Sequence, residues 1–119
     1  MATYHFSSYR FSDNGILWQG DRLVALTPLQ RRMLGCFCRN PRDLLSKAML
    51  MEQVWGHEDV SEMSLARSVH GLRRKLGTAR QGAELIRNVY GEGYIFTPAV
   101  EVVEESASAA VLAVAGLAS

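Results

Sequence analysis

The segment from residue 62 to residue 76, EMSLARSVHGLRRKL, has its apolar residues at the spacing of an amphipathic helix. Leu65, Val69, Leu72 and Leu76 follow one another at steps of four, three and four, which places them along one stripe. The opposite face is basic, small or polar. It consists of Met63, Arg67, His70, Gly71 and Arg74, with Ser64 and Lys75 at its edges. A helix with these two faces is either a solvated helix at the edge of a domain or one that lies in a DNA major groove, which is wide enough to admit a helix.

Capping residues predict two further helices before this one. The sequence Thr27-Pro28-Leu29-Gln30 combines a capping box with a proline at the first helical position, so we expect a helix from residue 28 to about residue 38. Ser46 is expected to cap a helix over residues 47–55, and Ser61 is expected to cap the helix described above.

The remaining patterns predict short strands. Residues 4–26 contain aromatic and branched runs broken by turn sequences, which indicates an antiparallel sheet of three or four strands. Leu44-Leu45 is expected to pair as a very short strand, and residues 84–90 and 94–97 read as a β-hairpin. The order sheet, helix, helix, helix, hairpin predicts an α+β fold. It is a winged helix-turn-helix with an N-terminal antiparallel sheet, three helices and a C-terminal β-hairpin wing.

The length and composition indicate a single domain. Of the 119 residues, 48% are hydrophobic, which is enough for a core. We expect a domain over residues 1–98 and an acidic, then Ala-rich tail or linker over residues 99–119. The longest apolar run, 107–118, is too short to span a bilayer, and no signal peptide is recognised.

The two cysteines indicate a reducing compartment. Cys36 and Cys38 are expected to be free thiols. We therefore expect a cytoplasmic domain, either by itself or as the cytoplasmic part of a longer or membrane-anchored regulator.

Charge is segregated along the chain although the net charge is only +1. Between residues 63 and 90 there are six basic residues and one acidic residue, a balance of +5, whereas the part after Pro98 carries three glutamates and no basic residue. A concentrated positive segment on the predicted third helix and hairpin favours a nucleic-acid partner more than the net charge does.

Motifs for catalysis or metal binding were not found. Gly91-Glu92-Gly93 precedes a strand and not a helix, so it is not a dinucleotide fingerprint, and the chain has no G-x-S-x-G sequence. His57-Glu58 lacks the second histidine of a zinc protease, and the cysteines and other histidines do not have zinc-finger spacing. We therefore expect no enzyme activity, no catalytic residue, no metal and no cofactor.

Four segments carry a resemblance to a known family. In order, they are LTPLQRRML, NPRDLLSKAMLMEQVWG, SLARSVHGLRRKLG and LIRNVYGEGYIF. Together they resemble the OmpR/PhoB-type winged helix-turn-helix DNA-binding domain over about residues 9–96. Within that family the chain is most similar to the ToxR, CadC and HilA group of bacterial regulators.

The resemblance implies a sequence-specific, DNA-binding transcriptional regulator of bacterial type. It places helix 62–76 in the major groove of double-stranded DNA and wing 84–97 at the minor groove. It also implies that the loop His57, Glu58, Asp59 contacts RNA polymerase, and that the domain binds DNA as a homodimer or in tandem. The competing interpretation is a winged-helix module that binds a protein partner without specific DNA binding; the low net charge, Gly71 and Tyr90 favour it.

The resemblance assigns roles residue by residue. Arg67 and Gly71 match positions that face base edges, although relatives often carry an arginine at the second position. Arg73 matches a position that contacts a phosphate. Tyr90 stands where an arginine commonly enters the minor groove, and either Asn88 or Arg87 faces DNA, with the family position favouring Asn88. The expected DNA-binding residues are Trp55, Ser64, Arg67, Ser68, His70, Gly71, Arg73, Arg74, Asn88, Tyr90 and Tyr94.

Three of these residues have an alternative interpretation as ordinary structure. Arg67 is read either as a bidentate partner of guanine or as a solvated arginine. His70 is read either as a neighbour of phosphate or a base or as a solvated residue. Gly71 is read either as a point of close approach to DNA or as a tolerated weak position in a helix.

Overall fold

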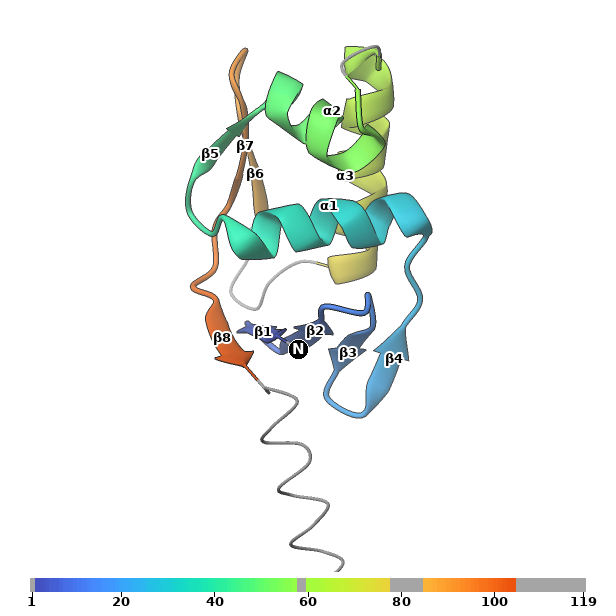
Figure 1. The fold of residues 1–119 in the computed structure, drawn as a ribbon, viewed down its shortest axis with the longest axis vertical. Coiled ribbons are helices and arrows are strands. Elements are labelled where there is room, and N and C mark those ends of the chain that lie inside the picture. Colours follow the sequence, from blue (N-terminus) through green and yellow to red (C-terminus); the bar gives the residue numbers. More distant parts are fainter. Residues whose placement is uncertain (1, 58–59, 78–84, 105–119) are drawn as a thin grey trace, which may run out of the picture.

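The computed structural model describes residues 2–57, 60–77 and 85–104. A central helix, α1 (Pro28–Arg39), crosses the molecule between two layers. A five-stranded sheet lies on one side of it, and two helices and a three-stranded sheet lie on the other (Figure 1). This arrangement confirms the predicted α+β winged-helix fold.

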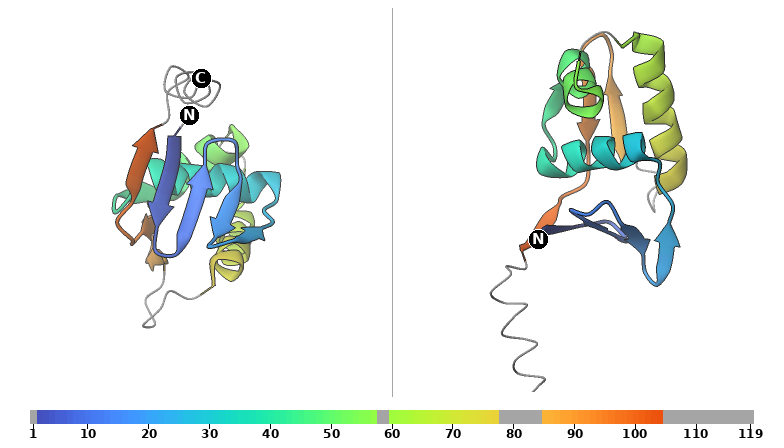
Figure 2. Two further views of the ribbon diagram at one scale, coloured as in Figure 1. Left: turned by 90° about the horizontal axis from the view of Figure 1, so that it is seen from below. Right: turned by 45° about the vertical axis from the view of Figure 1, so that its right-hand side comes forward.

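The five-stranded sheet contains the N-terminal strands in meander order. Its members are β1 (Ala2–Phe6), β2 (Tyr9–Ser12), β3 (Leu17–Gln19), β4 (Arg22–Val24) and β8 (Glu101–Glu104). They are arranged β4-β3-β2-β1-β8 and every neighbouring pair is antiparallel, as the view onto the face of the sheet shows (Figure 2, left). Alternation places Tyr4, Phe11 and Leu17 on the face that meets α1, and these side chains are buried.

The strand β8 extends the domain past residue 98, where the sequence analysis placed the start of the tail. Glu101–Glu104 pairs with the free edge of β1, with Tyr4 opposite Val102. The two branched valines suit a strand, but all four residues are exposed, so no alternation of buried and exposed positions marks them as part of the sheet.

The helices begin at the expected caps. In α1 the Thr27 hydroxyl accepts from the amide of Gln30 at 3.2 Å, and the Gln30 side chain accepts from the amide of Thr27 at 2.9 Å. This reciprocal pair confirms the predicted capping box. Ser46 caps α2 (Lys47–Trp55) and Ser61 caps α3 (Glu62–Leu76). In each case the serine hydroxyl accepts a hydrogen bond from the amide three residues later.

The three-stranded sheet holds the wing against the helices. It consists of β5 (Leu44–Ser46), β7 (Gly93–Phe96) and β6 (Ile86–Val89), in the order β5-β7-β6. The predicted hairpin is therefore present, and its second strand is central because the predicted short strand at residues 44–46 pairs with it. Part of the first predicted strand, residue 84, lies outside the described residues.

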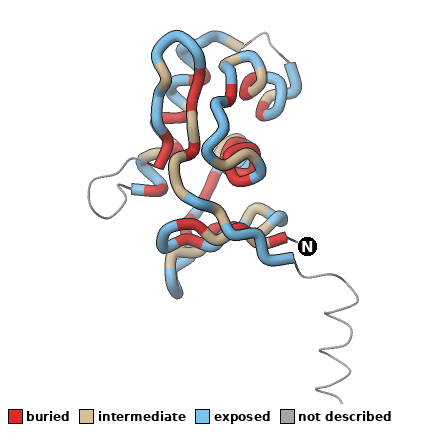
Figure 3. The backbone as a smooth tube through the Cα atoms, turned by 90° about the vertical axis from the view of Figure 1, so that its left-hand side faces the viewer, coloured by how far each residue is buried: buried red, intermediate tan, exposed pale blue. Residues whose placement is uncertain are grey.

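Buried residues join the two layers through α1. Six consecutive residues of this helix, from Met33 to Cys38, are buried, and Figure 3 shows the buried positions gathered along it and on the strands that face it. The Phe96 ring meets Phe37 of α1 at a centroid distance of 5.8 Å and Phe6 of β1 at 5.0 Å. One aromatic cluster therefore connects the wing, the central helix and the N-terminal sheet.

Gly93 marks the closest approach between two strands of the wing sheet. A Cβ atom at this position would overlap the main-chain carbonyl oxygen of Leu45, which belongs to β5. Only glycine fits there, because the obstacle is backbone and not the movable end of a side chain.

We expect Gly93→Ala to lower the free energy of unfolding by about 3 kcal/mol, since the strands must separate to admit the methyl group. The control is Gly91→Ala in the neighbouring turn, where a Cβ would meet nothing within 4 Å and the only strain comes from a φ of +73°. That control is expected to cost about 1 kcal/mol. Urea unfolding followed by circular dichroism measures both, and equal losses would contradict the close approach.

Candidate nucleic-acid interface

The two faces of α3 have opposite character. Leu65, Val69, Leu72 and Leu76 are at most 1% exposed and pack into the core. On the opposite face the side chains are exposed and mostly basic. They are Met63, Arg67, His70 and Arg74. The 15-residue helix therefore presents a continuous outer surface, with Arg67 near its middle.

The N-terminal end of α3 is fixed by its cap and by an ion pair. The Ser64 amide donates to the Ser61 hydroxyl at 3.1 Å, and the two hydroxyl oxygens are 2.9 Å apart. Lys47 of α2 lies 3.4 Å from the Glu62 carboxylate, so the first turns of the two helices are joined. Ser64 is exposed and Ser68 is half-buried, so Ser64 has the more accessible hydroxyl for a phosphate oxygen.

Gly71 lies toward α1 and not at the centre of the outer face. A Cβ atom at Gly71 would be 3.3 Å from Nε2 of Gln30, the residue whose Oε1 closes the capping box of α1. The glycine is half-buried at this contact. The close packing of α3 on the start of α1 explains why a residue without a side chain occupies this position. That Gly71 also faces a base edge stays a prediction.

Arg73 joins α3 to the wing. Its Nε and Nη2 atoms both donate to the main-chain carbonyl oxygen of Ile86 in β6, at 3.0 and 2.8 Å. The side chain is half-buried between the two elements. Sequence reasoning assigned Arg73 to a phosphate and missed this contact, because no pattern in the sequence identifies a main-chain carbonyl as its partner. Two of its five N–H donors are engaged here, and the phosphate contact stays a prediction.

A second contact fixes the C-terminal end of α3. The Tyr9 hydroxyl of β2 donates to the main-chain carbonyl of Leu76 in the last turn of the helix. Burial raises the pKa of the Tyr9 hydroxyl, so it remains a protonated donor at neutral pH. The sequence places these residues 67 positions apart and gives no signal that would pair them.

The wing exposes its tip and one strand. Tyr90 at the tip is 96% exposed, whereas Tyr94 in β7 is only 7% exposed. Asn88 pairs with Tyr94 and shares the strand face of buried Ile86, which is the face turned toward the helices. Arg87 is also exposed but points to the other face, so Asn88 is the residue of this pair on the helix side of the wing.

The helix α2 and the loop after it contain the remaining predicted residues. Trp55 is half-buried against the core at the end of α2, and Gly56 ends the helix in the left-handed conformation at φ +86°. His57 is exposed, and Glu58 and Asp59 of the predicted polymerase loop lie outside the described residues.

The described residues do not contain a group of three or more His, Cys, Asp or Glu side chains that could hold a metal ion. Burial raises the pKa of the Cys36 and Cys38 thiols, so both are neutral at physiological pH and neither is activated as a nucleophile. Within the same residues, the helices lack the length and apolar character needed to cross a membrane. The outer face of α3 offers hydrogen bonding and positive charge through the exposed Arg67 and Arg74.

Comparison with solved structures identifies domains of the same fold. The DNA-binding domain of Klebsiella pneumoniae RstA, solved in complex with the RstA box, matches with a TM-score of 0.71 at 24% identity over 82% of this chain and 98% of that one. The DNA-binding domain of Escherichia coli CadC matches with a TM-score of 0.73 at 20% identity, over 88% of this chain and 98% of that one.

Sequence comparison gives relatives among transcriptional regulators. The chain is 31% identical over 102 residues to the transcriptional regulator HilA of Salmonella typhimurium, which covers 86% of this chain and 18% of that protein. It is 32% identical over 98 residues to the transcriptional regulatory protein YvrH of Bacillus subtilis, covering 81% of this chain and 41% of that protein. The chain thus spans less than half the length of these relatives.

The model of one protein family matches residues 20–96, which include all three helices and the wing. That family is described as "Transcriptional regulatory protein, C terminal", and it comprises the OmpR/PhoB-type DNA-binding domains. On this match, and on the winged-helix fold described above, the chain belongs to the OmpR/PhoB-type family of transcriptional regulatory domains.

Proposed function

We propose that this chain binds double-stranded DNA at a specific sequence and thereby regulates transcription, with α3 in the major groove and the wing at the minor groove. The observation that carries the proposal is the exposed outer face of α3, which carries the basic residues Arg67, Arg74 and Lys75 from its middle to its last turn and lies beside an exposed wing. A structure of a relative, RstA, was solved in complex with its DNA box, which supports the same partner here.

Arg67 is the residue best placed for reading bases. It is exposed near the middle of the outer face, and a guanidinium can donate two hydrogen bonds to O6 and N7 of guanine. Arg74 is exposed one turn past His70 on the same face, and Lys75 is exposed beside it. These two groups supply attraction to phosphates that does not depend on sequence.

The wing contributes a different kind of contact. Tyr90 exposes almost its whole ring at the tip, and Asn88 faces the helix side of the same strand. An amide can read the minor-groove edge, and an aromatic ring can be inserted or packed along the sugar walls. We therefore assign the contacts in the minor groove to these two residues. Tyr94 is nearly buried, so we assign it to support of the strand, with its hydroxyl as the one group that reaches the DNA backbone.

Further partners belong to the same proposal. The loop of His57, Glu58 and Asp59 is proposed to contact RNA polymerase, and binding as a homodimer or in tandem on DNA is proposed from the family resemblance. The chain spans 18% of the length of HilA, so these partners are proposed for this domain alone.

Selection from random DNA with the purified chain at about 150 mM salt tests the function as a whole. We expect an enriched site that is bound about a thousandfold more tightly than a scrambled sequence. Equal binding to both sequences, abolished by salt, would contradict specific recognition and favour the interpretation as a protein-interaction module.

Arg67→Ala is expected to reduce the preference for the enriched site over scrambled DNA by about 1–3 kcal/mol, because one bidentate base contact is lost. The matched control is Arg22→Ala on β4, an exposed arginine in the N-terminal sheet, which should leave both affinities unchanged. Fluorescence anisotropy titrations of both DNAs measure the effect. Wild-type discrimination by the Arg67→Ala variant would exclude its role in base readout.

Arg73→Ala and Arg74→Ala are expected to separate two roles of neighbouring arginines, namely fixing the wing to α3 and attracting the phosphates of DNA. Loss of Arg73 removes two charge-assisted hydrogen bonds to Ile86 and should lower the free energy of unfolding by about 2 kcal/mol. It should also weaken binding to all sequences, since the wing is no longer fixed to α3. Loss of exposed Arg74 should leave stability unchanged and reduce the salt dependence of binding by about one ion.

Urea unfolding and anisotropy at several salt concentrations measure both variants. If Arg73→Ala unfolded like the wild type, the contact to Ile86 would not stabilise the domain. The assignment of Arg73 would then revert to a phosphate contact alone.

A further inference from the structure

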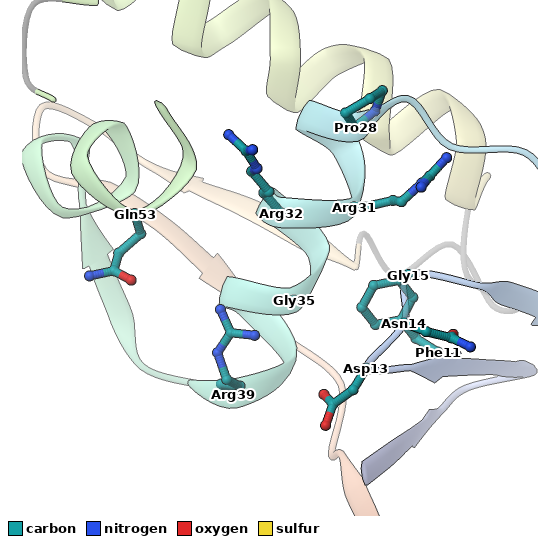
Figure 4. A pocket seen from close by; sticks show the side chains of 10 residues that line it. All are labelled: Phe11, Asp13, Asn14, Gly15, Pro28, Arg31, Arg32, Gly35, Arg39 and Gln53. Carbon is teal, nitrogen blue, oxygen red and sulfur yellow. The ribbon is translucent and has the colours of Figure 1, made fainter. Parts of the chain in front are cut away.

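A groove lies along the outer side of α1, between this helix, the turn that follows β2, and α2. Its volume is about 330 Å³ (Figure 4). Three arginines of α1 line it, namely Arg31, Arg32 and Arg39, together with Gln53 of α2 and the turn residues Asp13 to Gly15. All three arginines are exposed. The groove is therefore a basic hollow of the size that small ligands occupy.

Two glycines provide room for two of these arginines. A Cβ atom at Gly35 in the middle of α1 would be 3.0 Å from Nη1 of Arg39, and its nearest neighbours are all atoms of that guanidinium. A Cβ atom at Gly15 would be 2.6 Å from Cδ of Arg31. Glycine is unfavourable in the interior of a helix. At position 35, however, the lack of a side chain leaves room for the Arg39 side chain to fold back along α1 into the groove. This is a structural explanation for Gly35.

The charges of the groove are not neutralised by the described part of the protein. Arg31 and Arg39 form no ion pair with any described residue, and Arg32 makes a single long hydrogen bond of 3.4 Å to the Val54 carbonyl. The one carboxylate in the groove, Asp13, accepts a hydrogen bond from the amide of Ala2 at 3.0 Å. Three positive groups face one acid, which leaves a net charge of about +2 at physiological pH.

The groove is separate from the proposed DNA interface. Gln30 lies against Gly71 of α3. Arg32 and Arg39 follow Gln30 by two and nine positions, which places them on roughly the opposite side of α1, and Arg31 lies about a quarter of a turn from Gln30. In Figure 4 Arg39 lies on the near side of α1, Arg32 and Arg31 extend from the helix in different directions, and α3 passes behind the start of α1. A ligand in this groove would occupy a face that DNA bound to α3 does not need.

We propose that this groove binds a small ligand that carries two or more phosphate groups. A guanidinium group can donate two parallel hydrogen bonds to two oxygens of one phosphate group, whereas a halide ion has no pair of oxygens to accept them and a neutral ligand lacks the negative charge. Arg31, Arg32 and Arg39 bring three separate guanidinium groups to one groove, so a ligand with several phosphate groups has more partners there than a monophosphate has. A di- or triphosphate, or a compound with phosphates at two ends, offers this larger number of acceptor oxygens.

Titration with sodium tripolyphosphate, the probe, tests the site in the full chain at constant ionic strength. Isothermal calorimetry should show saturable binding, and the amide signals of Gly15 and Gly35 in two-dimensional NMR should shift with it. The double variant Arg31→Ala/Arg39→Ala should weaken binding at least about tenfold, since two charge-assisted contacts are lost. The control Arg22→Ala removes an exposed arginine outside the groove and should leave binding unchanged.

Gly35→Ala provides a second test that does not remove any charge. The added methyl group should displace the Arg39 guanidinium from the groove and weaken tripolyphosphate binding, while the urea midpoint is maintained or raised. Wild-type binding by this variant would contradict the role of Gly35. An equal loss of binding in Arg22→Ala, or shifts confined to α3 and the wing, would overturn the site as non-specific charge attraction.

A DNA arm of the experiment distinguishes a small ligand from the phosphate backbone. Without tripolyphosphate, the double variant should bind the selected DNA site, or any duplex if no site is found, as tightly as the wild type. A loss comparable to that of Arg74→Ala would show that these arginines contact DNA and would overturn the small-ligand proposal. Because calorimetry with tripolyphosphate needs no DNA, this proposal and the proposed function can fail separately.

Discussion

Burial of α1 between two sheets is the constraint on which the rest of the structure depends. The five-stranded sheet covers one side of the helix, and α2, α3 and the wing cover the other. Phe37 is fully buried at the centre of this sandwich, and Phe96 reaches from the wing to contact both Phe37 and Phe6. Because both layers pack on this one helix, each layer is positioned relative to the other through it.

The same constraint positions α3. Its leucine and valine stripe packs into the core, its start is tied to α2 by Lys47 and Glu62, and its last turn accepts a hydrogen bond from Tyr9 of the opposite layer. The outer face is thus held from both ends while its basic side chains are exposed. A helix that is held at both ends and exposes its side chains on one face is suited to recognition, because the backbone entropy is lost on folding and not on binding.

Local features of the chain were predictable because their causes are local. The caps at Thr27, Ser46 and Ser61 depend on residues three positions away, and the stripe of α3 depends on a period that any window of 15 residues contains. The contacts of Arg73 with Ile86 and of Tyr9 with Leu76 were not predictable, because each acceptor is a main-chain carbonyl that has no sequence signature. The strand β8 was missed for a related reason: it pairs with an edge and buries no side chain of its own. Within the candidate interface, the exposure of Arg67 followed from periodicity, whereas the position of Gly71 against Gln30 required the packing of two helices.

The acceptor that Arg73 uses has a consequence for how such domains diversify. Every residue type offers the same carbonyl oxygen, so the link between helix and wing does not depend on which side chain occupies position 86 or its neighbours. The residues that restrict the hairpin are the buried Ile86, Tyr94 and Phe96, together with Gly93, where β5 and β7 approach closely. The side chain at the exposed wing tip, Tyr90, can therefore vary without changing the acceptor that Arg73 uses on β6.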